Sequence, residues 1–214
     1  CDPGLPGPRK CGAMPRVLRL PARHAALSAA MESLADSHAT APEDAGLQGH
    51  LATLARYHRW ALHRLYEQVV VLPEPDYRRD AGLYFKSVHG TLNHLLVGER
   101  QLWWRRFSEG VSPQLTLDAE AEPDRTRLRE RLLDAAGDWQ PFVAACDAAR
   151  LTGSLDYTTM KGLPVSLPFA ATLAHVFNHA THHRGQITAA LTSMGHACPE
   201  LDLVWMLQRE GAKP

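Results

Sequence analysis

The sequence has no excess of charge of either sign, since 23 Lys and Arg residues stand against 23 Asp and Glu residues. Proteins that bind nucleic acid or an anionic membrane surface usually carry a basic region or a positive net charge. The charge balance therefore gives no support for a nucleic-acid partner or a membrane partner.

Cysteine is scarce, and so are long hydrophobic runs. The four cysteines are Cys1, Cys11, Cys146 and Cys198. None of them form a C-x-x-C pair, so the spacing predicts neither a zinc ribbon nor a disulfide framework. No apolar run approaches the roughly 18 residues that a membrane span needs. These absences favour a soluble protein in the reducing cytoplasm.

Residues 1–46 have little periodic hydrophobicity and are rich in Pro, Gly, Ala and Arg. A segment of this composition cannot bury enough apolar surface to offset the entropy lost on ordering. We therefore expect residues 1–46 to be a disordered N-terminal extension, and residues 47–210 to form the folded domain.

In the folded part, apolar residues recur at steps of three and four, which is typical of amphipathic helices. Four long helices are predicted at 48–72, 87–107, 124–149 and 168–194, and a short one at 200–209. Residues 73–86 have the composition of a loop. Residues 151–167 alternate in polarity and indicate either a short hairpin or an irregular crossover. The expected fold class is all-α.

The most informative stretch is 174–186, which reads AHVFNHATHHRGQ. His175, His179 and His183 are spaced i, i+4 and i+8, so on a helix they lie within roughly 40° of a common direction. Neutral imidazole is the commonest protein ligand for zinc-like metals, and two imidazoles four residues apart can hold one ion. The spacing predicts a metal-binding stripe, with a further ligand supplied from elsewhere in the chain.

Histidine is also common as a core or surface residue, so a chance cluster without metal is an alternative. His94 has Gly90 one turn before it and Gly98 one turn after it, and nothing bulky stands beside its ring on that face. This notch suits a ligand, although glycines at this spacing equally permit close helix packing. His58 falls on the apolar side of the first helix and can approach the site, whereas His89 lies on another side of its helix.

Two segments resemble the DinB family, part of the wider DinB/YfiT-like group of helical-bundle proteins. They are GTLNHLLVGERQLWWRRF at 90–107 and HVFNHATHHRGQITAALTSMG at 175–195. The pattern N-H-x-x-x-H-R-G-Q in the second segment is close to a family signature. The early helix with Tyr57, Trp60 and Ala61 is similar to the opening helix of the family. The resemblance covers about 47–208.

This resemblance implies a four-helix bundle with a long crossover connection, often assembled as a homodimer. It also implies a divalent metal bound by three histidines, which at the matching positions are His94, His179 and His183. His175 precedes the usual pair by one turn. His182 points about 100° away from His183, so we do not expect both to bind the same ion.

Three neutral imidazoles leave coordination positions open for water, which is typical of a catalytic metal site. A bound metal can lower the pKa of water or of a thiol and so generate a nucleophile. Related families in the group are thiol-dependent transferases and isomerases. The resemblance therefore implies a metal-dependent hydrolase or thiol S-transferase, with a low-molecular-weight thiol as a second cofactor. Zinc or nickel is expected, and iron or manganese is also compatible with imidazole ligands.

The zinc-protease motif H-E-x-x-H is incomplete, because Ala180 stands where its glutamate would be. No general base comes with the motif, so peptidase activity is not expected. Glu99 and Gln186 are the nearest groups that could hold a ligand imidazole or orient water. Glu99 could instead form an ion pair with Arg100 or Arg184.

A second functional hypothesis is a stress-associated, damage-inducible dimer in which the metal only stabilises the fold. A protein group closing the metal shell, such as His175 or His58, would favour that structural role. An exchangeable water in the open position would favour an enzyme. The sequence names neither a catalytic residue nor a substrate.

Overall fold

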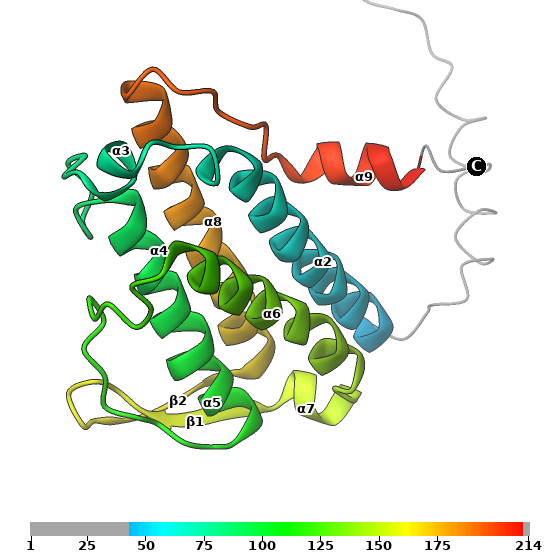
Figure 1. Ribbon diagram of the computed structural model, residues 1–214. Helices are drawn as coiled ribbons and strands as arrows, with labels where there is room; N and C mark the ends of the chain where they lie inside the picture. The colour runs from blue at the N-terminus through cyan, green and yellow to red at the C-terminus, as the bar shows by residue number, and fades with distance from the viewer. Residues whose placement is uncertain (1–42, 212–214) are drawn as a thin grey trace, which may run out of the picture. The chain divides into compact units, whose positions relative to one another are not determined.

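The computed structural model describes residues 43–211, in which long helices surround a common core and one small hairpin lies at one end (Figure 1). The expected N-terminal extension lies outside the described residues, except for its last four positions, which already belong to a helix. The elements are α2 (Glu43–Val69), α3 (Glu74–Arg78), α4 (Val88–Leu96), η1 (Val97–Trp103), α5 (Trp104–Ser108), α6 (Arg125–Ala144), α7 (Ala148–Thr152), β1 (Ser154–Thr158), β2 (Pro164–Pro168), α8 (Phe169–Ser193) and α9 (Leu203–Gly211).

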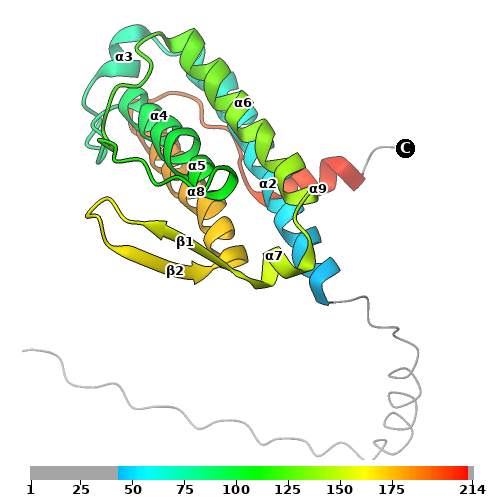
Figure 2. The ribbon, with the colours of Figure 1, turned by 90° about the horizontal axis from the view of Figure 1, so that it is seen from below.

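The main core lies where α2, α4, α6 and α8 face one another. Leu65 of α2, Leu95 of α4, Leu132 of α6 and Ile187 of α8 are all fully buried in one cluster. Burial of this apolar stripe stabilises each helix more than its own propensity does. Figure 2 views the helices from below and places α6 alongside α2, with α8 alongside α4. The predicted helical character is confirmed.

Strands β1 and β2 pair antiparallel, in the register Ser154↔Pro168 to Thr158↔Pro164. The fold is therefore mostly helical rather than all-α, and the hairpin interpretation of this stretch is the correct one. Alternation explains the strand, because Leu155 is buried against the helices while Asp156 is exposed. Gly162 has a φ of 77° in the connecting turn, a conformation that favours glycine.

A single continuous helical rod runs through α4, η1 and α5. Ser87 begins it as the N-cap, and its side chain accepts a hydrogen bond from the Gly90 N–H. Residues Val97–Trp103 are a π-helix, in which the Trp104 N–H donates to the Glu99 carbonyl. The rod matches the predicted helix at 87–107, but the π segment was not predicted. Such segments add one residue to a turn and re-aim the side chains that follow.

Two other predicted segments differ from the structure. The predicted helix at 124–149 ends at Ala144, and α7 begins separately because Asp147 caps it by accepting from the Arg150 N–H. Residues 73–86 are not entirely loop, since they contain the short helix α3, whose Tyr77 is buried.

Within 43–211, no helix combines the length and apolar character needed to cross a bilayer.

Candidate metal centre

Three histidines from two helices bring their ring nitrogens to one point. His94 comes from α4, while His179 and His183 are one turn apart on α8. Nε2 of His179 lies 3.2 Å from Nε2 of His94 and 3.1 Å from Nε2 of His183. Their candidate ligand atoms all lie within 4.8 Å of one another. The structure therefore brings together the set that the family resemblance implied.

Hydrogen bonds on the far side of two rings decide which nitrogen faces this point. Nδ1 of His94 lies 2.8 Å from the Leu117 carbonyl oxygen, and Nδ1 of His183 lies 2.7 Å from Oε1 of Gln186. Both oxygens can only accept, so each Nδ1 carries the proton. Nε2 of His94 and Nε2 of His183 are therefore left as unprotonated lone pairs.

The three converging nitrogens are better arranged to bind a cation than to hydrogen-bond with one another. One Nε2–H on His179 could donate to only one of its two neighbours, leaving the other lone pair without a donor. Nδ1 of His179 is buried and has no hydrogen-bond partner. Two nitrogens bound about 2.0–2.1 Å from a tetrahedral zinc ion lie roughly 3.3–3.4 Å apart. The distances of 3.1 and 3.2 Å are close to that spacing.

Burial keeps these imidazoles neutral near pH 7. Desolvation, with a contribution from His183 and His94, lowers the pKa of His179 to about 3. Desolvation likewise lowers the pKa of His183 to about 4, and it lowers the pKa of His94 despite the opposing bond to Leu117. A metal ion binds neutral imidazole, so it would displace no proton from these rings at pH 7.

A loop before α4 fixes the ring of His94. Phe85 stacks on His94 with ring centroids 3.8 Å apart and an interplanar angle of 14°. The loop can approach only because position 90 has no side chain: a Cβ there would lie 2.2 Å from the Phe85 carbonyl oxygen. At Gly98, a Cβ would lie 3.6 Å from Cε1 of His179, an ordinary contact. The notch around His94 is thus filled on one side by Phe85.

The loop that carries Leu117 is held by the residue preceding His94. Asn93 is buried, and it donates to the Glu122 carbonyl and accepts from the Glu122 N–H. These two bonds tie the segment between α5 and α6 to α4. The two adjacent residues therefore act together on this loop. Asn93 holds it against α4, and Nδ1 of His94 donates to the Leu117 carbonyl that the loop carries.

The other histidines considered from the sequence lie elsewhere. His175 is exposed, with its ring 5.8 Å from that of His179 and edge-on to Trp103. His182 is exposed beside His183. His89 contacts Tyr77 and Glu120 on another side of α4.

A buried charged network beside the histidines was only partly foreseen. Arg184 donates to Nδ1 of His58 at 2.9 Å, which leaves the proton on Nε2 of that ring. Nε2 of His58 lies 2.9 Å from Oε2 of Glu99, and both side chains are 1% exposed. Glu99 thus contacts His58 rather than a ligand histidine, whereas Gln186 does contact one. Sequence periodicity could place these residues on inward faces, but it could not pair them.

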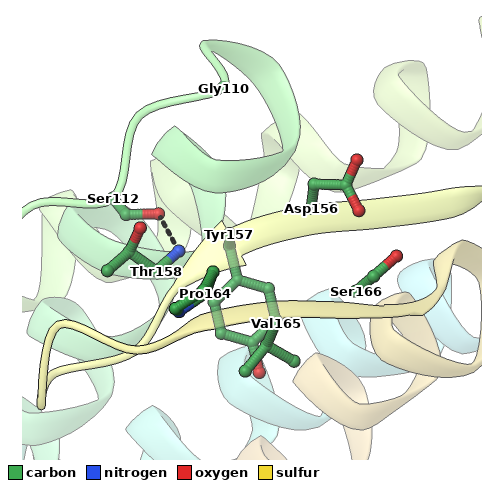
Figure 3. Close-up of a pocket in the computed structure, with 8 residues that line it drawn as sticks. All are labelled: Gly110, Ser112, Asp156, Tyr157, Thr158, Pro164, Val165 and Ser166. Carbon is green, nitrogen blue, oxygen red and sulfur yellow. Dashed lines mark hydrogen bonds between the residues drawn. The ribbon is translucent and has the colours of Figure 1, made fainter.

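A cavity of about 640 Å³ lies between the β-hairpin and the segment after α5. Figure 3 shows Ser112 beside Thr158, whose N–H donates to the Ser112 Oγ at 3.0 Å. The lining of this 640 Å³ cavity contains no histidine or cysteine. A smaller cavity of about 360 Å³ is bordered by Trp103 and by His175, which lies one turn before His179 on α8.

Comparison with known proteins agrees with this geometry. The family model described as "DinB family" matches residues 45–213. "Protein DinB" of Bacillus subtilis (strain 168) is 25% identical over 163 residues, which cover 70% of this chain and 88% of that protein. No solved structure matches the chain. Because the family model spans more than half of the sequence, including all three facing histidines, the chain belongs to the DinB family.

Proposed function

We propose that this DinB-family protein binds one divalent metal ion through Nε2 of His94, His179 and His183. The observation that supports it is the convergence of these nitrogens, two of which have a free lone pair because the opposite nitrogen donates its proton to an oxygen. We further propose that residues 47–210 form a four-helix bundle domain of the family type, with the hairpin as part of its long crossover, preceded by an extension at 1–46.

The proposed role of the metal is catalytic, in a metal-dependent hydrolase or thiol S-transferase. Such an ion supplies Lewis acidity and lowers the pKa of a bound water or of a low-molecular-weight thiol. The surroundings favour an open coordination position. Both ring nitrogens of His58 already face Glu99 and Arg184, and His175 does not belong to the group of converging nitrogens.

No general base accompanies the histidine motif. Ala180 is fully buried in the core where a zinc protease would place its glutamate. The carboxylate of Glu99 is directed at His58 instead. A metal ion held by the three histidines would therefore have to activate the nucleophile, a requirement that the hydrolase and the thiol S-transferase share.

Cobalt substitution tests whether the position is open. The visible spectrum of the Co²⁺-loaded protein should change when azide is added, because azide replaces an exchangeable water. The same change is expected in His175→Ala, since His175 is not a proposed ligand. A spectrum insensitive to azide in both proteins would contradict the enzyme and favour a closed, structural metal in a non-catalytic stress-associated dimer.

Zinc or nickel is the proposed native metal, with iron or manganese as alternatives, because imidazole ligands suit several of these ions. We also propose a cytoplasmic homodimer. Sedimentation of the purified protein should then give twice the chain mass of 23.7 kDa. A mass of one chain at micromolar concentration would contradict the dimer.

A further inference from the structure

A cavity of about 360 Å³ lies between the end of η1, the hairpin and the start of α8, and His175 forms part of its lining. Its walls include Trp103, Tyr157, Leu167 and Ala171. The hydroxyl of Thr172, which also borders it, already donates to the Pro168 carbonyl. The walls are therefore mainly apolar and partly aromatic, as in small-molecule pockets.

His175 stands between this cavity and the metal centre. It borders the cavity, where its ring lies 5.4 Å from that of Trp103. Its ring also lies 5.8 Å from that of His179, one turn further along α8. The ring of His175 therefore lies between a molecule seated in the cavity and the proposed ligand His179.

The aromatic wall is backed by a buried positive charge. Arg106 is 4% exposed, and its guanidinium carbon lies 4.7 Å from the Trp103 ring centroid and 4.2 Å from that of Tyr157. Its Nη2 donates to the Thr158 carbonyl, while its Nε is buried without a partner. No acidic side chain among the described residues forms an ion pair with it.

A buried cation without a counterion is unfavourable, and a bound anion would offset its cost. Burial lowers the pKa of Arg106, because desolvation disfavours the charged guanidinium. The rings of Trp103 and Tyr157 meet at 69°, so together they form an apolar corner against which a flat apolar group can pack. The volume is near the lower end for small-molecule sites, which restricts the occupant to a small compound.

We propose that this cavity binds a small organic anion with a flat apolar body, which packs in the corner between Trp103 and Tyr157 and is attracted by the charge of Arg106, with His175 between it and the histidine cluster. The proposal of a binding site is supported by the cavity and by the buried charge of Arg106. Only its assignment as the substrate pocket rests on the proposed metal-dependent function.

Calorimetric titration of the purified full-length protein with 2-naphthoate and the neutral 2-naphthamide tests the proposal. We expect naphthoate to bind about tenfold more tightly than naphthamide, because only the anion is attracted by the nearby charge of Arg106. No binding of naphthoate, or equal affinity for the two compounds, would overturn it.

Two pairs of variants locate the binding. Ala171→Trp fills the cavity from an exposed position on α8 and should abolish naphthoate binding, whereas Ala189→Trp, at an exposed position of the same helix, should not change it. Arg106→Gln should remove the preference for the anion, and Arg106→Lys should keep it. Unchanged affinity in Ala171→Trp would overturn the proposal even if Arg106→Gln did not fold.

Metal content measured in the same samples separates this proposal from the proposed function. Ala171→Trp should hold as much metal as the parent, because Ala171 is not one of the residues whose ligand atoms converge. If the parent holds no metal, the metal-dependent function fails, yet the naphthoate titration still decides whether the pocket exists.

Discussion

Gln186 determines the orientation of one proposed ligand. Its Oε1 accepts from Nδ1 of His183, which fixes the ring and leaves Nε2 unprotonated. Residues that hold a metal-bound histidine in this way typically contribute about 10–100-fold to metal affinity. The amide was foreseeable from the sequence, because residues three apart on a helix are neighbours.

Gln186→Leu should therefore weaken zinc binding by about 10–100-fold, since Nδ1 of His183 would lose its acceptor. Gln186→Glu keeps an acceptor oxygen at the same place and should retain affinity near that of the parent. Competition with a chromogenic zinc chelator measures both variants. Equal affinity of Gln186→Leu and the parent would show that the ring needs no such support.

At the scale of the element, two glycines in the rod formed by α4, η1 and α5 differ in whether they can be replaced by alanine. Gly90→Ala would place a Cβ 2.2 Å from the Phe85 carbonyl, so the loop must move and Phe85 must leave His94. Gly98→Ala makes only an ordinary contact of 3.6 Å with His179. Alanine also has a helix propensity roughly 0.8–1.0 kcal/mol better than glycine.

We expect Gly90→Ala to lower both the melting temperature and the zinc affinity, and Gly98→Ala to leave zinc affinity unchanged while keeping or raising the melting temperature. Thermal unfolding with and without zinc measures all four quantities. A Gly90→Ala protein that binds zinc like the parent would contradict the role given to the loop of Phe85.

The elements were predictable where local pattern decides them. The Ser87 cap, Pro168 before α8 and Gly195 after it, with a φ of 78°, all follow from local chemistry. The separate α7, the short α3 and the π segment were not predicted. Each depends on interactions that periodicity does not encode, such as the cap by Asp147 or the burial of Tyr77.

The same distinction applies to the candidate site. The stripe of His179 and His183 is visible in the sequence, because one helix carries both. Its partnership with His94 came from family resemblance, since residues 85 positions apart meet only in the fold. The stacking of Phe85 on His94 and the carbonyl of Leu117 depend on loop conformation, so nothing in the local sequence indicated them.

At the scale of the whole molecule, acidification should destabilise the metal-free protein. The unfolded chain has histidine pKa values near 6.5, whereas burial lowers the pKa of His179 to about 3 and that of His183 to about 4. Below pH 6.5 these two histidines are therefore protonated in the unfolded state but stay neutral in the folded state. The stabilisation is fully present above pH 6.5 and is lost as the pH falls towards 4.

Urea unfolding in EDTA at pH 7.5, 6.5 and 5.5 measures this effect. The free energy of unfolding should decrease as the pH falls in the parent. In His183→Gln, which cannot titrate at that position, the slope should be smaller by about half a proton at pH 6.5 and by nearly one proton at pH 5.5. A slope unchanged by the substitution would mean that His183 is not held neutral by the fold.

The central claim is that His94, His179 and His183 hold one divalent metal ion. Elemental analysis of the untagged protein tests it most directly, alongside His179→Ala and His182→Ala as a matched pair from the same helix. The account predicts about one metal ion per chain in the parent and in His182→Ala, and little in His179→Ala. A metal-free parent that zinc and nickel fail to stabilise against heating would contradict it, as would equal metal content in both variants.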